Sequence, residues 1–284
     1  MGKAQVSRAV LITGCSTGIG RATAERLAKR GHRVYATARR LEAVEDLKAA
    51  GCETLRLDVT DEASMVEAVE AVVAAEGAVG ALVNNAGYSQ GGAVESLDID
   101  AVRRQFETNV FGAIRLVQLC LPGMRDQGWG RIVNVSSMGG RFTLPGGGAY
   151  HASKHALEAF SDALRWEVAG FGVGVSIVEP GIVLTDFPNA HAEAVDSHTD
   201  GGPYEAFNTA VRTRVDSAYT GPLAKLGTGP EKIARVIERA VTSSRPKTRY
   251  RVGVDARSIL LVRRSLPDRV FDTFLRSQYP RPSA

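Results

Sequence analysis

The stretch Tyr150-His151-Ala152-Ser153-Lys154 holds two side chains that could exchange a proton with a substrate. On a helix, residues four apart lie on the same face, so Tyr150 and Lys154 would point into the same space. A free phenol titrates near pH ~10, and a neighbouring ammonium group lowers that pKa toward the neutral range. The pair therefore suits acid-base chemistry on an alcohol or carbonyl oxygen. The same spacing is also typical of a core tyrosine beside a solvated lysine, so its meaning depends on the surrounding elements.

A glycine-rich turn follows the first apolar segment of the chain. Glycines allow the backbone to approach a pyrophosphate, and the N-terminus of the following helix offers unpaired N–H groups. A tight connection between a strand and a helix could use the same residues. Because the turn follows the first strand of an alternating α/β chain, we expect a dinucleotide site here. Its candidate residues are Gly14, Ser16, Thr17, Gly18, Ile19 and Gly20.

Two arginines, Arg39 and Arg40, stand at the end of the second expected strand. An NAD site usually places Asp or Glu there to bond the ribose 2′-hydroxyl, whereas Arg suits a 2′-phosphate. The arginines therefore favour NADP(H), and NAD(H) is the main alternative because the pair could also be a solvated charged corner. Asp58, just after the third expected strand, could accept a hydrogen bond from the adenine amino group or serve as a turn or cap.

Strand and helix patterns alternate along the chain. Strands are expected at Ala9–Thr13, Arg33–Ala38, Thr54–Leu57, Ala81–Val83, Arg131–Val135, Gly174–Val178 and Arg249–Val252. Helices are expected from the glycine turn to Arg30, at Leu41–Ala50, after a Thr60 cap, at Asp100–Gln127, from Tyr150 onward and at Pro230–Thr242. The alternation predicts an α/β fold: a single-domain, Rossmann-type doubly wound parallel sheet over residues 1–284.

Two regions depart from this pattern. Residues 186–229 mix Pro, Gly and His with short apolar pieces, as substrate-binding lids often do. Residues 255–284 form a C-terminal extension in which Leu, Ile and Val alternate with Arg. We expect this extension to contain a helix packed on the body or on a second subunit. Peripheral contact with a membrane surface is the less favoured alternative.

Composition argues against several other classes of protein. The formal net charge is only +4 over 284 residues, and basic residues do not interleave with aromatic ones, so nucleic acid is not an expected partner. The isolated Cys15, Cys52 and Cys120 lack metal-ligand spacing, which favours reduced thiols in a cytoplasmic protein without a metal. A signal peptide pattern is lacking, and no apolar run reaches about eighteen residues, so neither secretion nor a membrane span is expected.

Together these motifs resemble the classical short-chain dehydrogenase/reductase family. The matching residues run from Thr13 to about Thr185 in the family's order and spacing. They are Thr13-Gly14-x-x-x-Gly18-x-Gly20, Asn84-Asn85-Ala86-Gly87, Asn109, Ser136-Ser137, Tyr150-x-x-x-Lys154 and Pro180-Gly181-x-x-x-Thr185. The resemblance implies an oxidoreductase that interconverts an alcohol and its ketone or aldehyde with NADP(H), or alternatively NAD(H), as cofactor.

The resemblance also implies roles for individual residues. Tyr150 would be the acid/base, Lys154 would lower the tyrosine pKa and bond the nicotinamide ribose, and Ser137 would hold the substrate oxygen. Ser136 is the local alternative to Ser137, because neighbouring strand residues face opposite sides. Asn109 would anchor a water that relays protons to Lys154; its residue type alone would indicate a core polar group bonded to backbone. Further cofactor contacts are expected at Asp58, Val59, Asn85, Ala86, Gly87, Pro180, Gly181, Val183 and Thr185. The family gives His151 and His155 no role, so both are expected at the surface.

Segments 34–39 and 178–181 resemble the branch that contains 17β-hydroxysteroid and retinol dehydrogenases. That branch implies a bulky apolar substrate, steroid-, retinoid- or lipid-like, and a homodimer or homotetramer formed through the helices at 100–127 and 150–168. The alternative class is a dinucleotide sensor that keeps the fold without turnover. A sensor would be expected to lose Tyr150, Lys154 or Ser137, and all three are present.

Overall fold

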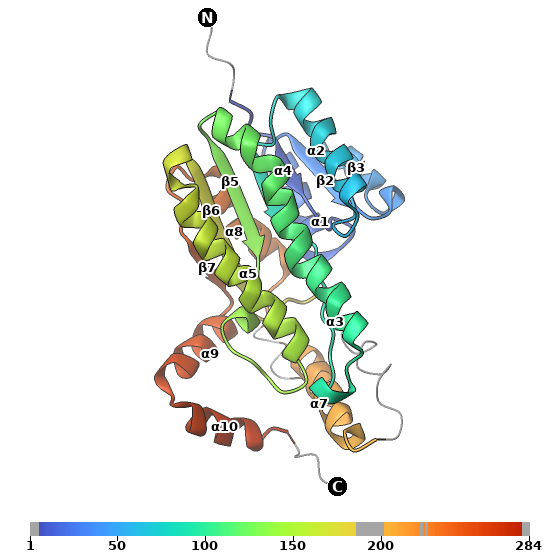
Figure 1. Cartoon of the computed structure of the whole chain (residues 1–284), viewed down its shortest axis with the longest axis vertical. Coiled ribbons are helices and arrows are strands. Elements are labelled where there is room, and N and C mark those ends of the chain that lie inside the picture. Colours follow the sequence, from blue (N-terminus) through green and yellow to red (C-terminus); the bar gives the residue numbers. More distant parts are fainter. Residues whose placement is uncertain (1–5, 186–201, 222–223, 225–226, 280–284) are drawn as a thin grey trace, which may run out of the picture.

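The computed structural model describes residues 6–185, 202–221, 224 and 227–279 (Figure 1). These residues form a seven-stranded sheet in the order β3-β2-β1-β4-β5-β6-β7, in which every neighbouring pair is parallel. The strands are β1 (Val10–Ile12), β2 (Val34–Ala38), β3 (Glu53–Arg56), β4 (Ala81–Asn84), β5 (Gly130–Val135), β6 (Val173–Pro180) and β7 (Arg249–Val252). The order reverses between β1 and β4, and in doubly wound sheets ligands bind outside the carboxyl ends of the strands at this point.

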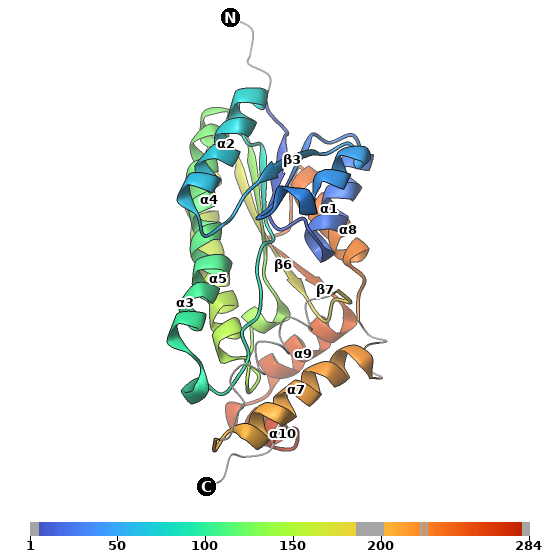
Figure 2. The same cartoon turned by 90° about the vertical axis from the view of Figure 1, so that its right-hand side faces the viewer.

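Helices cover both faces of the sheet (Figure 2). One face carries α1 (Gly18–Lys29) and α8 (Pro230–Thr242), and the other carries α2 (Glu62–Glu76), α4 (Gly112–Asp126) and α5 (Gly148–Glu167). Successive strand residues point to opposite faces, so Val10 and Ile12 pack in one core and Leu11 packs in the other. Since both faces are covered, inner strands such as β1 and β4 are largely apolar, which explains why the sequence pattern located them, whereas the edge strands β3 and β7 carry charged residues.

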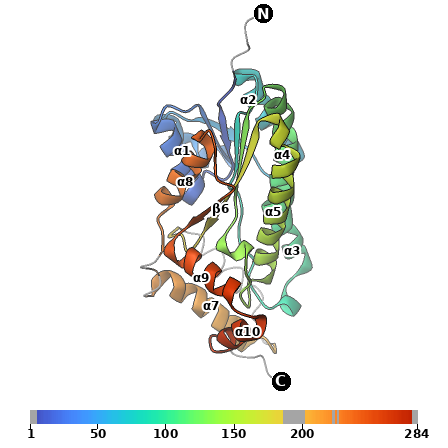
Figure 3. The same ribbon diagram turned by 90° about the vertical axis from the view of Figure 1, so that its left-hand side faces the viewer.

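The remaining described helices lie at the sheet's ends and edges. They are η1 (Leu41–Ala43), η2 (Glu45–Ala50), η3 (Val94–Ser96), α3 (Ile99–Phe106), the π-helix η4 (Glu107–Phe111), η5 (Met138–Gly140), η6 (Ala169–Phe171), α7 (Glu205–Thr220), α9 (Val254–Ser265) and α10 (Asp268–Arg276). Helices α7, α9 and α10 lie beyond the carboxyl ends of the strands (Figure 3). None of the helices in the described ranges is long and apolar enough to span a bilayer.

Not every sequence expectation about helices was right. The helix expected at Leu41–Ala50 is two short 3₁₀ helices, because the buried Val44 between them has a non-helical backbone (φ −132°, ψ −1°). The helix expected at Asp100–Gln127 is present, since α3, η4 and α4 follow one another without a break and only the η4 turn is π-helical. Within the stretch 186–229, where no regular element was expected, residues 205–220 form α7. Residues 186–201 of that expected lid lie outside the described residues.

The C-terminal extension packs on the body, as expected for its helices. Phe271 of α10 is buried, and the Arg263 guanidinium of α9 lies 5.1 Å from the centre of its ring. One pocket is lined jointly by body and extension residues, among them Arg141, Phe142, His155, Arg263, Phe271 and Leu275.

The cap of α2 also differs from the expectation. Asp61, rather than Thr60, accepts hydrogen bonds from the backbone N–H groups of Ala63 (3.1 Å) and Ser64 (3.4 Å). We therefore expect Asp61→Ala to lower the free energy of unfolding by about 1 kcal/mol, the usual value of an N-cap. Thr60→Ala is the matched control and should change it by less than about 0.5 kcal/mol, as exposed substitutions usually do. Urea denaturation of both variants measures the difference, and equal effects would contradict the assignment of the cap.

Candidate active site

Two turns meet at the carboxyl ends of β1 and β4. The Asn85 side-chain amide donates to the carbonyl oxygens of Thr13 (2.9 Å) and Gly14 (3.0 Å). In return, Thr13 Oγ1 accepts from the backbone N–H groups of Asn85 (3.0 Å) and Ala86 (2.9 Å). Asn85 and Thr13 therefore hold the glycine turn against the 84–87 loop. The contribution of Thr13 was missing from the sequence-based site, because nothing in the local sequence shows which hydroxyl will reach a loop seventy residues away.

The glycine turn has the shape and polarity of an anion cradle. Gly14 and Gly18 adopt positive φ (70° and 59°), and a Cβ on Gly20 would overlap the carbonyl oxygen of Gly14. The N-cap Thr17 makes no side-chain cap bond within the described residues, so the first-turn N–H groups of α1 remain available to a ligand. Ser16 and Thr17 are exposed at this turn, and Ile19 packs against the core. The residues present therefore fit a dinucleotide pyrophosphate.

The adenosine end of this crevice would face the residues that follow β2 and β3. Arg39 and Arg40 are exposed, and no carboxylate in the described part of the chain pairs with either. In the loop after β4, burial raises the pKa of Tyr88, and the positive charges of Arg104 and Arg39 oppose this effect. Arg39 is therefore close enough to this loop to act on it electrostatically. Asp58 makes a local turn, since its Oδ1 accepts from the backbone N–H (3.0 Å) and the hydroxyl (2.8 Å) of Thr60. Val59 is buried against Gly112.

Tyr150, Ser137 and Lys154 lie together at the carboxyl end of β5. Ser137 is the N-cap of η5, where its Oγ accepts from Gly139 N (3.0 Å), and its hydroxyl is hydrogen-bonded with Tyr150. Lys154 lies one helical turn after Tyr150 on α5, with its Nζ 5.9 Å from the centre of the Tyr150 ring and donating to Val135 O (3.0 Å). Ser136 faces the opposite way, toward Glu158. Of the two serines, Ser137 therefore shares the site with Tyr150.

Burial dominates the ionisation of both groups. It raises the pKa of Tyr150, and the hydrogen bond with Ser137 opposes it only in part. Burial also lowers the pKa of Lys154 to about 8, although the nearby Glu158 carboxylate raises it. A Tyr150 pKa below the ordinary value was expected from the sequence. In the structure the direction is opposite, because loss of solvation outweighs the neighbouring groups.

Asn109 lies in the π-helix η4 beside the same cluster. Its Oδ1 accepts from Tyr88 N (3.0 Å), and its Nδ2 donates to Tyr88 O (2.9 Å) and Ser153 Oγ (3.0 Å). A Cβ on Gly87 would lie 3.0 Å from Asn109 Oδ1 and 3.4 Å from Lys154 Nζ, so these three residues are neighbours. The amide of Asn109 is thus bonded to protein, as its residue type alone indicated. Its expected role in a proton relay stays a prediction.

His151 was expected at the surface, and this was wrong. It is buried, its Nδ1 is hydrogen-bonded with Gly139 O (2.8 Å), and its ring meets the Tyr150 ring edge-on at 5.7 Å. Because burial lowers its pKa, the ring is neutral at physiological pH. His155 is exposed, as expected. His151 points inward because it lies with Ser153 and Lys154 on the buried side of α5. The spacing of Tyr150 and Lys154 alone does not show how wide that buried side is.

The loop after β6 closes the site from the other side. Gly181 N donates to Val252 O (2.9 Å), and a Cβ on Gly181 would overlap the Asp255 carboxylate. Asp255 Oδ2 accepts from Ile182 N (2.6 Å), an anchor that sequence reasoning missed because the partners are 73 residues apart. Val183 is buried, and a Cβ on Gly18 would lie 3.3 Å from Thr185. The Pro180–Thr185 segment therefore reaches over the glycine turn.

The chain matches the family model described as short chain dehydrogenase over residues 8–196. It is 35% identical over 271 residues to the uncharacterized oxidoreductase YbbO of Escherichia coli (strain K12), with 95% of this chain and 94% of that protein covered. It is also 35% identical to retinol dehydrogenase 5 of Homo sapiens, with 96% and 89% covered. The 3-ketodihydrosphingosine reductase of Bacteroides thetaiotaomicron is 33% identical, with 95% and 97% covered. The chain belongs to the short-chain dehydrogenase/reductase family, as the motifs indicated.

Solved structures agree with this assignment. A short-chain dehydrogenase from Streptomyces avermitilis superposes with a TM-score of 0.78 at 36% identity, covering 93% of this chain and 95% of that one. A serine dehydrogenase complexed with NADP⁺ superposes at 0.75 (26% identity, 86% and 94% covered). A family member from Burkholderia phymatum in complex with NAD superposes at 0.77 (26% identity, 100% and 99% covered). The protein is therefore an oxidoreductase of alcohols and carbonyls with the Rossmann-type fold, and its structural neighbours bind either nicotinamide cofactor.

Proposed function

We propose that the protein is an NADP(H)-dependent carbonyl reductase and alcohol dehydrogenase for a bulky apolar substrate, with Tyr150 as acid/base. The observation that carries the proposal is the hydrogen-bonded Ser137–Tyr150 pair with Lys154 beside it, at the carboxyl end of β5, the strand next to β4. The anion cradle of Gly14, Gly18 and Gly20 lies at the same edge. Proton-exchanging hydroxyls next to a dinucleotide cradle suit hydride chemistry at a carbonyl carbon.

Ser137, Tyr150 and Lys154 have different roles at the carbonyl oxygen. Ser137 and Tyr150 donate hydrogen bonds to it, and these bonds strengthen as negative charge develops there. The bound nicotinamide supplies or accepts the hydride. In reduction, the Tyr150 hydroxyl gives its proton to the new alkoxide, and the Lys154 ammonium stabilises the phenolate that remains. In oxidation, the phenolate takes the proton back, so the same residues serve both directions.

The choice of NADP(H) rests on Arg39 and Arg40. Both guanidinium groups are exposed at the end of β2, and neither is paired with a described carboxylate. A 2′-phosphate would provide the missing anionic partner through charge-assisted hydrogen bonds. The remaining proposed cofactor contacts are the turn residues Gly14–Gly20, Asp58, Val59, the loop Asn85–Gly87 and the segment Pro180–Thr185.

An apolar substrate is favoured by the surroundings of Tyr150 and by the names of related proteins. Tyr219 of α7 is half-buried and close enough to Tyr150 for the two hydroxyls to affect each other's ionisation. The similar proteins named above include a retinol dehydrogenase and a 3-ketodihydrosphingosine reductase. We therefore propose a retinoid-, steroid- or lipid-like alcohol or ketone.

Exposed aromatic residues support a homodimer or homotetramer. Phe111, Phe160 and Trp166 are 49%, 49% and 77% exposed, and they lie on η4 and α5, in the segments that sequence analysis assigned to subunit contacts. Large aromatic side chains exposed together often mark protein interfaces. A second copy of this chain is the proposed partner.

The first test measures cofactor choice and turnover in the wild-type protein. NADPH is expected to bind at least about tenfold tighter than NADH, since the phosphate gains a charged hydrogen bond. Binding is followed by fluorescence of the reduced nicotinamide, and turnover is screened with retinaldehyde, a 17-ketosteroid and a long-chain ketone. Equal or tighter binding of NADH would overturn the cofactor assignment. Binding without turnover of any carbonyl in this set would count against the proposed substrate class.

A further inference from the structure

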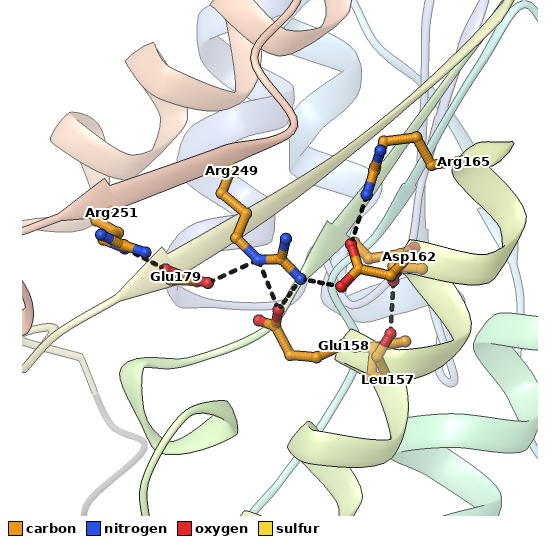
Figure 4. A network of polar contacts seen from close by, with 9 residues as sticks. Leu157, Glu158, Asp162, Arg165, Glu179, Arg249 and Arg251 are labelled. Atoms are coloured by element: carbon orange, nitrogen blue, oxygen red, sulfur yellow. Dashed lines mark hydrogen bonds and ion pairs between the residues drawn. The ribbon is translucent and has the colours of Figure 1, made fainter. Parts of the chain in front are cut away.

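A partly buried network of charges joins α5 to β6 and to the edge strand β7 (Figure 4). At its centre, Arg249 of β7 contacts three carboxylates. Its Nε donates to Glu158 Oε2 (3.0 Å) and lies 3.1 Å from Glu179 Oε1, and its Nη2 donates to Asp162 Oδ2 (2.6 Å). Glu158 and Glu179 are 4% and 0% exposed. Carboxylates so deeply buried need compensating charge, which Arg249 provides.

The three acids are not equivalent. Asp162 also pairs with Arg165 (3.0 Å), and Glu179 also pairs with Arg251 (3.0 Å). Among the described residues, Glu158 pairs with Arg249 only, and its Oε1 completes no hydrogen bond. Burial and the Glu179 carboxylate raise the pKa of Glu158, and Ser136 and Arg249 oppose them, so the negative charge of Glu158 depends on its contact with Arg249.

Glu158 lies one helical turn after Lys154 on α5. Tyr150, Lys154 and Glu158 follow one another at four-residue spacing along one side of this helix. A Cβ on Gly140 would lie 2.7 Å from Ser136 Oγ, 3.0 Å from Glu158 Cγ and 3.2 Å from the backbone oxygen of Lys154, so Gly140 packs against this part of the helix. Glu158 is also the acid whose charge acts on Lys154 to raise its pKa, against the larger effect of burial.

Among the described residues, the other groups that contact the Lys154–Tyr150 pair are uncharged. Lys154 Nζ meets the Val135 carbonyl of β5 and neighbours Asn109 of η4. Around Tyr150 lie Ser137, the neutral ring of His151 and the Tyr219 hydroxyl of α7. The remaining charged groups that face Glu158 are Arg249, Asp162 and Glu179 of its own network.

We propose that Glu158, held in place by Arg249, is a positioning residue that keeps Lys154 protonated in its buried site. The inference rests on the proposed function, in which the Lys154 ammonium stabilises the Tyr150 phenolate. Arg249 matters because a buried Glu without a partner would take up a proton and lose the charge that acts on Lys154. Strand β7, which leads into the C-terminal extension, thereby contributes to the electrostatics of the site.

Glu158→Gln tests the proposal because it keeps the shape of the side chain and removes its charge. Removal of a negative charge makes the Lys154 ammonium less stable, so the pKa of Lys154 should fall by about one unit. This is the size expected for a charge one helical turn away in a partly screened interior. NMR of isotope-labelled lysine ε-carbons measures the titration in the full chain, with the signal assigned through Lys154→Arg. In the pH–rate profile of ketone reduction with NADPH, the decrease on the alkaline side should also move to lower pH, because the Tyr150–Lys154 pair then loses its first proton at lower pH.

Asp162→Asn is the matched control. Asp162 also contacts Arg249, but it lies one further turn from Lys154 and its side chain is 38% exposed. Its loss should move the Lys154 titration by less than about 0.3 unit. An unchanged titration in Glu158→Gln, or equal shifts in both variants, would overturn the proposal, because a purely structural network does not distinguish the two acids.

A double variant covers the case in which Glu158→Gln does not fold. Glu158→Gln with Arg249→Met leaves Glu179 with Arg251 and Asp162 with Arg165, so no remaining acid loses its last arginine. Buried ion pairs replaced as a whole are often well tolerated. The Lys154 titration should again move to lower pH, by less than in the single variant, because the more distant positive charge is lost too; no shift would overturn the proposal. The NMR titration needs no turnover, so a shift in a protein that reduces no ketone would contradict the proposed function and leave this inference standing.

Discussion

Tyr150→Phe is expected to lower kcat about a thousandfold, within the range that general acid-base catalysis contributes. The substitution removes only the hydroxyl that would give its proton to the alkoxide. The phenyl ring would remain in the same place, packed against His151. The Kd for NADPH should therefore change by less than about twofold, because the glycine turn and Arg39 are untouched. Steady-state kinetics and a fluorescence titration of the same preparation measure both quantities.

Tyr35→Phe is the matched control for this experiment. Tyr35 is also buried, and its hydroxyl bonds with Glu76 (2.7 Å) rather than with any residue of the candidate site. It should leave kcat within about twofold of the wild-type value, since surroundings away from the chemistry contribute little to the transition state. Strong residual activity in Tyr150→Phe would show that the proton comes from elsewhere, and Ser137 or a bound water would then be the candidate donor.

The sheet could be predicted from the sequence because its strands are covered on both sides. Parallel strands such as Val10–Ile12 are nearly continuous apolar runs, and the helices between them require right-handed parallel crossovers. Elements that depend on packing were harder to predict. The non-helical backbone at the buried Val44 is an example, since tertiary packing can override local helical preference.

Helix α7 was missed for a related reason. Its described turns bury only Asn208 and Val211, so its sequence carries a weak apolar stripe that does not stand out from a loop. The tail was easier to interpret, because α10 concentrates its apolar residues on one face around the buried Phe271.

At the site, residue types and spacing located Tyr150, Ser137 and Lys154 together. Spacing could not give the residues that support them. Asp255 and Glu158 act through partners 73 and 91 residues away, and only the fold brings these partners together. Nor could spacing give the ionisation of Tyr150, since the pKa depends on how completely the fold removes its hydroxyl from water.

Arg39→Asp is expected to reverse the cofactor preference. Loss of the guanidinium removes a charged hydrogen bond to the 2′-phosphate, worth about 1.5–3 kcal/mol, and the new carboxylate repels the phosphate while accepting from a ribose 2′-hydroxyl. The ratio of NADPH to NADH affinity should therefore fall about a hundredfold. Nicotinamide fluorescence titrations with both cofactors measure the ratio.

Arg40→Asp separates a specific contact from the general charge of this corner. Both arginines are exposed at the end of β2, but the charge of Arg39 reaches Tyr88 in the loop across the crevice, whereas Arg40 is the N-cap residue of η1. If Arg39 binds the phosphate directly, its replacement should change the ratio much more than replacement of Arg40, and the Arg40 effect should largely disappear at high salt. Equal, salt-sensitive effects would mean that the corner attracts the phosphate only through its net charge. No effect of either substitution would mean that the two arginines are a solvated corner and that the preference for NADP(H) has no basis in this strand end.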